Sequence, residues 1–249
     1  MDHPVFHPPS ADPGGGDALS RRTILTGIAG VASAAALAAG PAAAKAIVKP
    51  TKEVPMPATA PTFTPDNAAI LLVDHQPGVL NMIGSLPHEV VTRNAAMLAA
   101  LGHRLDIPLV ITSTRETIDF LGTTLKEVRE AAPTAYEKRI RRGGSLDAFA
   151  DPAFVAAVRA TGRRNLIIGG ILTDVCLAHS VQSALAAGYN VQVVADACGT
   201  TTELADAVTY DRLRARGAVI TTAYGILFDL YPDLSKPDAL KAEAVASGH

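Results

Sequence analysis

From residue 68 onward, short apolar runs alternate with segments of helical spacing, and this alternation limits the chain to few folds. Continuous apolar runs of this length indicate strands that are buried on both faces. The sequence predicts such strands at 69–73, 108–112, 165–169, 191–195 and 218–222, with a more polar strand within 135–141. Helices are predicted at 89–105, 125–132, 152–161, 174–188 and 202–217.

Strands separated by helices predict one doubly wound α/β domain, with a six-stranded parallel sheet and helices on both faces (Rossmann-like). In such folds ligands bind outside the carboxyl ends of the strands, where the strand order reverses. We therefore examine the residues that directly follow the predicted strands for chemistry.

Composition narrows the class of function. The formal charge is only -2, tryptophan is absent and aromatic residues make up 4% of the chain. There is no basic surface of the kind that binds nucleic acid or an anionic membrane, and no glycine-rich phosphate loop. We expect a small-molecule substrate and no cofactor.

The N-terminal 46 residues have a different character. Ser20-Arg-Arg-Thr-Ile-Leu25 pairs two arginines with apolar residues, an uncharged stretch follows to Gly40, and small residues offer cleavage after Ala44 or Ala46. This pattern is typical of a twin-arginine export signal. The alternative is a retained membrane anchor, but the stretch falls short of the roughly 20 apolar residues that a span needs.

The rest of the chain is predicted to contain three parts. A proline-rich linker or arm covers 47–64, the folded domain covers 65–235, and a C-terminal tail covers 236–249. With the signal 1–46 cleaved, the mature protein would be periplasmic or secreted, without stable membrane insertion. Export also exposes Cys176 and Cys198 to an oxidising compartment, but sequence cannot place them within bridging range.

Cys176 follows the fourth predicted strand after a Gly-Gly turn and the possible caps Thr173 and Asp174. This order predicts a thiol near the N-terminus of a helix, where free N–H groups and the helix dipole favour a thiolate. The alternative is an inert, buried cysteine that packs as a small apolar residue. Cys198 is interpreted as structural.

Asp74 directly follows the first strand, at the sheet edge where Cys176 is also predicted. A carboxylate there can act as general base toward a thiol, although it can equally be a turn or cap residue. His75 is a competitor as partner of the thiol. Neighbouring residues at a strand end point in different directions, so we do not expect both to reach Cys176.

Three motifs together resemble the isochorismatase-like cysteine hydrolases, in their YcaC-related branch. They are Ala69-Ile-Leu-Leu-Val-Asp-His-Gln76, Ile168-Gly-Gly-Ile-Leu-Thr-Asp-Val-Cys176 and Ala184-Leu-Ala-Ala-Gly-Tyr-Asn-Val-Gln-Val-Val-Ala-Asp-Ala197. The resemblance covers roughly residues 65–231. It implies an isochorismatase-like fold and a hydrolase acting on an amide, imide or related acyl bond.

The resemblance also assigns roles. It implies Cys176 as nucleophile, Asp74 as base and a third, basic member that is normally lysine. Arg142 stands at the best-matching position, with Lys138 as the alternative; an arginine stays protonated and cannot exchange protons. The resemblance further implies a cis peptide between Ile171 and Leu172, and an oxyanion hole formed by the N–H groups of Leu172 and Cys176.

Other residues are assigned more broadly. Gln76, Thr173 and His179 are expected in the substrate pocket, the last because it lies one helical turn from Cys176. The segment 111–119 after the second strand has no histidine, and His103 and His179 stand alone, so we expect no metal site. A non-catalytic or redox-responsive binding protein on the same scaffold remains the alternative function. Homo-oligomers are expected, since the segment 224–233 is apolar enough to pack on a partner.

Overall fold

The computed structural model describes residues 61–247. The predicted export signal (1–46) and most of the proline-rich segment (47–64) lie outside the described residues. Within them, no helix is both long and apolar enough to cross a membrane.

Six parallel strands form the central sheet, in the order β3-β2-β1-β4-β5-β6. They are β1 (Ala68–Val73), β2 (Leu109–Thr114), β3 (Ile140–Arg142), β4 (Asn165–Gly170), β5 (Asn190–Val194) and β6 (Val219–Thr221). The chain runs outward from β1 to β3, then returns to β4 on the other side of β1. The strand order therefore reverses between β1 and β4, which confirms the predicted doubly wound fold.

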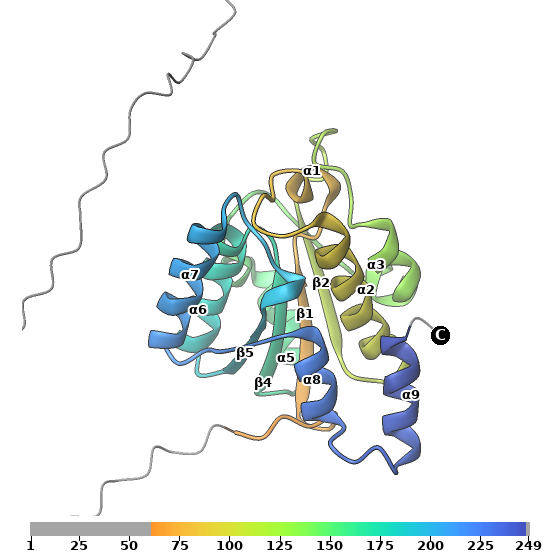
Figure 1. The fold of residues 1–249 in the computed structure, drawn as a ribbon. Coiled ribbons are helices and arrows are strands. Elements are labelled where there is room, and N and C mark those ends of the chain that lie inside the picture. Colours follow the sequence, from red (N-terminus) through yellow and green to blue (C-terminus); the bar gives the residue numbers. More distant parts are fainter. Residues whose placement is uncertain (1–60, 248–249) are drawn as a thin grey trace, which may run out of the picture. The chain divides into compact units, whose positions relative to one another are not determined.

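Helices cover both faces of the sheet (Figure 1). They are α1 (Pro77–Leu80), α2 (His88–Arg104), α3 (Lys126–Ala131), α4 (Pro133–Glu137), α5 (Pro152–Ala160), α6 (Ala178–Ala186), α7 (Glu203–Ala215), α8 (Ala223–Leu230) and α9 (Pro237–Ala246). Alternate residues of β1 separate the two faces: Ile70 and Leu72 belong to the core with α2, α3, α8 and α9. Leu71 and Val73 belong to the core with α5, α6 and α7.

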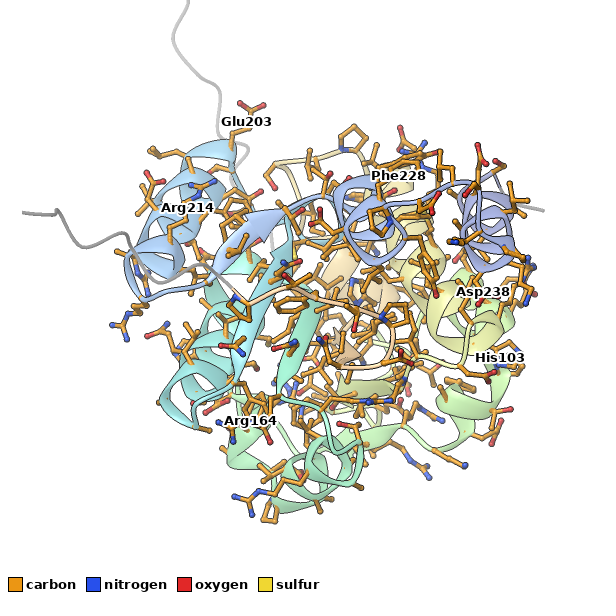
Figure 2. The ribbon with its side chains drawn as sticks, turned by 90° about the horizontal axis from the view of Figure 1, so that it is seen from below. His103, Arg164, Glu203, Arg214, Phe228 and Asp238 are labelled. Carbon is orange, nitrogen blue, oxygen red and sulfur yellow. The ribbon has the colours of Figure 1, made fainter. Side chains whose placement is uncertain are left out.

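The expected continuous apolar strands are present, because all six residues of β1 and all six of β4 are buried. Most charged side chains lie outside the sheet instead, and the buried exceptions include Asp74, Arg142 and Asp206. Figure 2 shows His103, Arg164, Arg214 and Asp238 at the rim of the molecule, with the sheet inside.

The predicted third strand is wrong in its first half. Residues 133–137 form helix α4, and the strand begins only at Ile140. Pro133 occupies the first turn of α4, where its missing N–H costs nothing. The ring of Tyr136 then packs under the guanidinium of Arg139, whose carbon lies 4.1 Å from the ring centroid.

The predicted helix at 174–188 also differs. Residues Thr173–Leu177 form a π-helical turn, and regular α-helix starts at Ala178. Four helices were not predicted: α1, α4 and α8, and α9 in the segment interpreted as a tail. In α9, Ala239, Ala242 and Val245 are buried at helical spacing against α2 and α8.

Candidate active site

Asp74 lies immediately beyond β1, at the point where the strand order reverses. Its backbone has φ 60°, a left-handed conformation that aspartate tolerates better than most residues. The side chain is fully buried. One carboxylate oxygen, Oδ2, accepts a hydrogen bond from Nη2 of Arg142, while Oδ1 accepts no N–H or O–H donor of the described residues.

Arg142 ends the edge strand β3 and reaches Asp74 across β2. Its Nε donates to Oγ1 of Thr112 at 2.9 Å, and its Nη1 donates to the carbonyl oxygen of Ser145. The side chain is 1% exposed, so every donor is directed at the protein. Lys138 is instead exposed at the end of α4, and no ion pair or hydrogen bond of the described residues joins it to Asp74. The structure thus brings Arg142, and not Lys138, to the carboxylate.

Cys176 lies in the π-helical turn that follows β4 and is 7% exposed. Ser180 fixes this turn, because its hydroxyl donates to the carbonyl oxygen of Cys176 at 2.7 Å and accepts from the N–H of Ala148 at 3.0 Å. π-Helical turns are rare and are frequent at functional sites.

The thiol lies next to both charged groups of the site. Burial, followed by the charge of Asp74 and a hydrogen bond to it, raises the pKa of Cys176 to about 12, while Arg142 opposes that rise. Burial also raises the pKa of Asp74, against the influence of Arg142 and of the thiol. Desolvation and the neighbouring carboxylate therefore oppose the thiolate that the sequence predicts at a helix N-terminus, and that thiolate stays a prediction.

The peptide bond between Ile171 and Leu172 is cis. The N–H of Thr173 donates to the carbonyl oxygen of Gly199, and the carbonyl oxygen of Leu172 accepts from Val175 and Leu177. The N–H of Leu172 donates to no backbone carbonyl of the described residues. The N–H of Cys176 donates to neither the carbonyl oxygen of Ile171 nor that of Leu172. The oxyanion hole formed by the N–H groups of Leu172 and Cys176 stays a prediction.

The three residues predicted to line the pocket have different environments. Gln76 is fully buried, and its side-chain amide forms hydrogen bonds with backbone groups of Thr114 and Gly122. These bonds connect Gln76 to the loop that follows β2. Thr173 is the first residue of the π-helical turn and is fully buried. His179 is exposed, and its Nδ1 bonds to the carbonyl oxygen of Val175.

His75 and Cys198 do not approach the thiol as partners. The Nε2–H of His75 donates to the carbonyl oxygen of Ala197 at 2.9 Å, and burial lowers its pKa to about 4. The thiol of Cys198 donates to the carbonyl oxygen of Val194 at 3.0 Å. Both cysteines are free.

A cavity of about 420 Å³ opens beside Arg142. Its lining residues are Arg115, Glu116, Thr117, Arg141, Arg142 and Gly143. Arg115, Thr112 and Ser145 were not singled out in the sequence; the polar run Thr112-Ser-Thr-Arg115 at the end of an apolar strand was the available signal. A larger hollow of about 810 Å³ lies over α2 and α9 and contains none of the three site residues. No group of three or more metal-ligating side chains occurs in residues 61–247.

Comparison with known proteins places this geometry in a family. The model of the isochorismatase domain matches residues 68–224. The probable hydrolase YcaC of Escherichia coli is 36% identical over 169 residues, which cover 68% of this chain and 79% of that protein. Isochorismatase domain-containing protein 2 of Xenopus laevis is 28% identical over 171 residues, covering 69% and 79%.

Solved structures agree. A YcaC structure from Pseudomonas aeruginosa, with hexane-2,5-diol and covalent acrylamide, has a TM-score of 0.71 at 31% identity and covers 78% of this chain and 94% of that one. The E. coli YcaC gene product, described as an octameric hydrolase of unknown specificity, has a TM-score of 0.70 at 32% identity, covering 77% and 90%. The chain therefore belongs to the isochorismatase-like hydrolases, in their YcaC-related branch.

Proposed function

We propose that this protein is a cysteine hydrolase that cleaves an amide, imide or related acyl bond of a small molecule through a thioester on Cys176. The observation that carries the proposal is the buried group of Cys176, Asp74 and Arg142 at the carboxyl ends of β4, β1 and β3. A thiol, a carboxylate with one free oxygen and a fixed positive charge are the groups that nucleophilic acyl transfer requires.

In the first step Sγ of Cys176 attacks the carbonyl carbon while Oδ1 of Asp74 takes the thiol proton. The resting thiol is protonated because its pKa is raised to about 12, so proton removal accompanies attack. The carbonyl oxygen becomes an oxyanion that accepts hydrogen bonds from the N–H groups of Leu172 and Cys176.

Collapse of this intermediate breaks the C–N bond, and Asp74 returns its proton to the leaving nitrogen. A water molecule then attacks the thioester carbon and gives a proton to Asp74. The C–S bond breaks, Asp74 returns this proton to Sγ, and the free thiol and a carboxylic acid result. Arg142 keeps its proton throughout and stabilises the carboxylate and the developing thiolate.

The relatives support this chemistry. The P. aeruginosa YcaC structure holds covalent acrylamide. Acrylamide is a small amide whose alkene reacts with nucleophilic side chains, so its covalent attachment is the behaviour that a reactive nucleophile in this branch would produce.

The test is a screen of small amides and imides with the wild type, Cys176→Ala and the matched control Cys198→Ala. We expect turnover in the wild type and the control, and none in Cys176→Ala with an unchanged circular dichroism spectrum. Intact-protein mass spectrometry with slow substrates should show an acyl adduct on Cys176. Turnover that persists in Cys176→Ala would overturn the proposal. Rapid peroxide oxidation of Cys176 without any turnover would favour the redox-responsive alternative.

The proposal extends to location and assembly. The paired arginines Arg21 and Arg22 support export to the periplasm or beyond, which the mass of the mature N-terminus tests. A homo-oligomer is supported by the octameric E. coli relative and by the exposed ring pair Tyr224 and Phe228 on α8, whose centroids are 6.2 Å apart. Light scattering of the purified protein tests the assembly.

A further inference from the structure

Two arginines that take no part in the proposed acyl transfer border the cavity beside Arg142. Arg115 follows β2 and Arg141 lies in β3, and both are exposed. Within residues 61–247 neither guanidinium forms an ion pair or a side-chain hydrogen bond.

The other charges around this cavity are already compensated. Arg142 is bound to Asp74. Glu116 accepts hydrogen bonds from Arg139 on both oxygens, at 2.7 and 2.9 Å, and a third from Ser113 at 2.6 Å. Arg115 and Arg141 therefore remain at the cavity without an ion pair or side-chain hydrogen bond among the described residues, although the charge of Arg141 acts on Glu116 and that of Arg115 on Asp74.

Backbone geometry holds Arg115 over the cavity. Its N–H donates to the carbonyl oxygen of Arg142 at 2.9 Å, and its φ of 44° is in the left-handed region that branched and bulky residues avoid. Its side chain crosses Gly144, where an added Cβ would come within 3.1 Å of Cδ of Arg115. Gly144 has no side chain, and this leaves space for the side chain of Arg115.

The cavity is also coupled to the site. Arg142 lines the cavity and binds Asp74, and the charge of Arg115 contributes to lowering the pKa of Asp74 against the larger effect of burial. The cavity lining includes Arg142 but neither Cys176 nor Asp74, so a molecule there would lie beside the partner of the proposed base.

We propose that Arg115 and Arg141 bind a carboxylate of the substrate, so that the acyl compound presented to Cys176 is an anion. A guanidinium offers paired N–H donors that match a carboxylate, and the two arginines here have no competing partner. This inference rests on the proposed function, and it names the substrate class that the site selects.

The test compares alkylation of Cys176 by iodoacetate, an anion, and by neutral iodoacetamide, in a Cys198→Ala background so that one thiol is labelled. Both reagents react with the thiolate of Cys176, so a change in the fraction of thiolate alters both rates equally and does not alter their ratio. We expect Arg115→Gln with Arg141→Gln to lower the iodoacetate-to-iodoacetamide ratio about tenfold, since each arginine supplies a hydrogen bond to a charged group. Arg212→Gln, which changes an exposed arginine on α7, should leave it unchanged.

Binding of benzoate and benzamide to Cys176→Ala, measured by calorimetry, tests anion recognition without the nucleophile. Tighter binding of benzoate, lost in the double arginine variant, supports the inference. The inference is overturned if benzoate and benzamide bind with equal affinity. It is also overturned if the double arginine substitution changes neither the affinity for benzoate nor the labelling ratio. Failure of the proposed function is seen separately, as turnover that persists in Cys176→Ala.

Discussion

Asp74 and Arg142 form an ion pair that is closed to solvent, with side-chain exposures of 0% and 1%. The pair joins residues from β1 and β3, which are separated in the sheet by β2. Arginine keeps its proton, so Arg142 cannot relay one. Oδ1 of Asp74 accepts no N–H or O–H donor within residues 61–247, and it is the acceptor that the proposed mechanism assigns to the proton of Cys176. The predictions below follow from this arrangement and from the residues that hold it.

Asp74→Asn should abolish turnover while making Cys176 more reactive toward iodoacetamide. Burial raises the pKa of the thiol most, and Asp74 raises it further, so removing the carboxylate charge lowers that pKa from about 12 and leaves Arg142 to stabilise the thiolate. Loss of a general base costs roughly 10²- to 10⁴-fold in turnover. The control is Asp106→Asn, an exposed aspartate at a similar φ of 55° before β2. Slower labelling of Asp74→Asn at pH 8 would contradict the assigned role.

Arg142→Met should destabilise the fold by about 3–5 kcal/mol in urea unfolding, because it leaves a buried carboxylate without its partner. Arg142→Lys keeps the charge but loses the hydrogen bonds to Thr112 and Ser145. Its loss of folding stability should therefore be smaller than that of Arg142→Met. The exposed pair of Arg214 and Asp211 provides the contrast, and Arg214→Met should cost about 1 kcal/mol or less. Equal losses for Arg142→Met and Arg214→Met would show that the buried pair does not stabilise the site.

Gln76→Ala should loosen the loops that frame the cavity. The amide of Gln76 accepts from the N–H of Thr114 at 2.7 Å and donates to the carbonyl oxygens of Thr114 and Gly122 at 3.0 and 2.7 Å. Its removal leaves buried backbone groups unpaired, at a cost of about 1–3 kcal/mol. Hydrogen exchange should increase at 114–122. Gln182→Ala, which loses one hydrogen bond within α6, should not change exchange there. Unaltered exchange at 114–122 in Gln76→Ala would contradict the role of a clamp.

His75 should make the fold sensitive to acid. Burial lowers its pKa from 6.5 to about 4, so below pH 6.5 the unfolded chain binds a proton that the folded protein refuses. The stability from neutral His75 is complete above pH 6.5 and is lost as the pH falls toward 4, by up to about 3 kcal/mol. His75→Gln keeps a donor for Ala197 and should flatten this dependence in urea unfolding between pH 7 and 4. The exposed His179→Gln should follow the wild type, and an equally steep profile for His75→Gln would assign the acid sensitivity elsewhere.

Local pattern was enough to predict the sheet and most helices, since the apolar strands and the helix breakers act over a few residues. It failed where local signals conflict. Pro133 starts a helix that runs into the segment 135–141, where a polar strand was predicted. The small apolar face of α9 gives a weak helical signal along the sequence, and that face is buried only by packing against α2 and α8.

The positions of Asp74 and Cys176 directly after apolar strands could be predicted from the sequence, because parallel strands bring their carboxyl ends to one edge. Tertiary structure alone showed that Arg142, and not Lys138, reaches Asp74, because β3 lies two strands away and its register decides which side chain points inward. It also showed the burial and the neighbouring charge that raise the pKa of the thiol, and the two exposed arginines at the cavity. Secondary structure depends on neighbours along the chain, whereas burial and charge pairing depend on groups far apart in sequence that meet only in the fold.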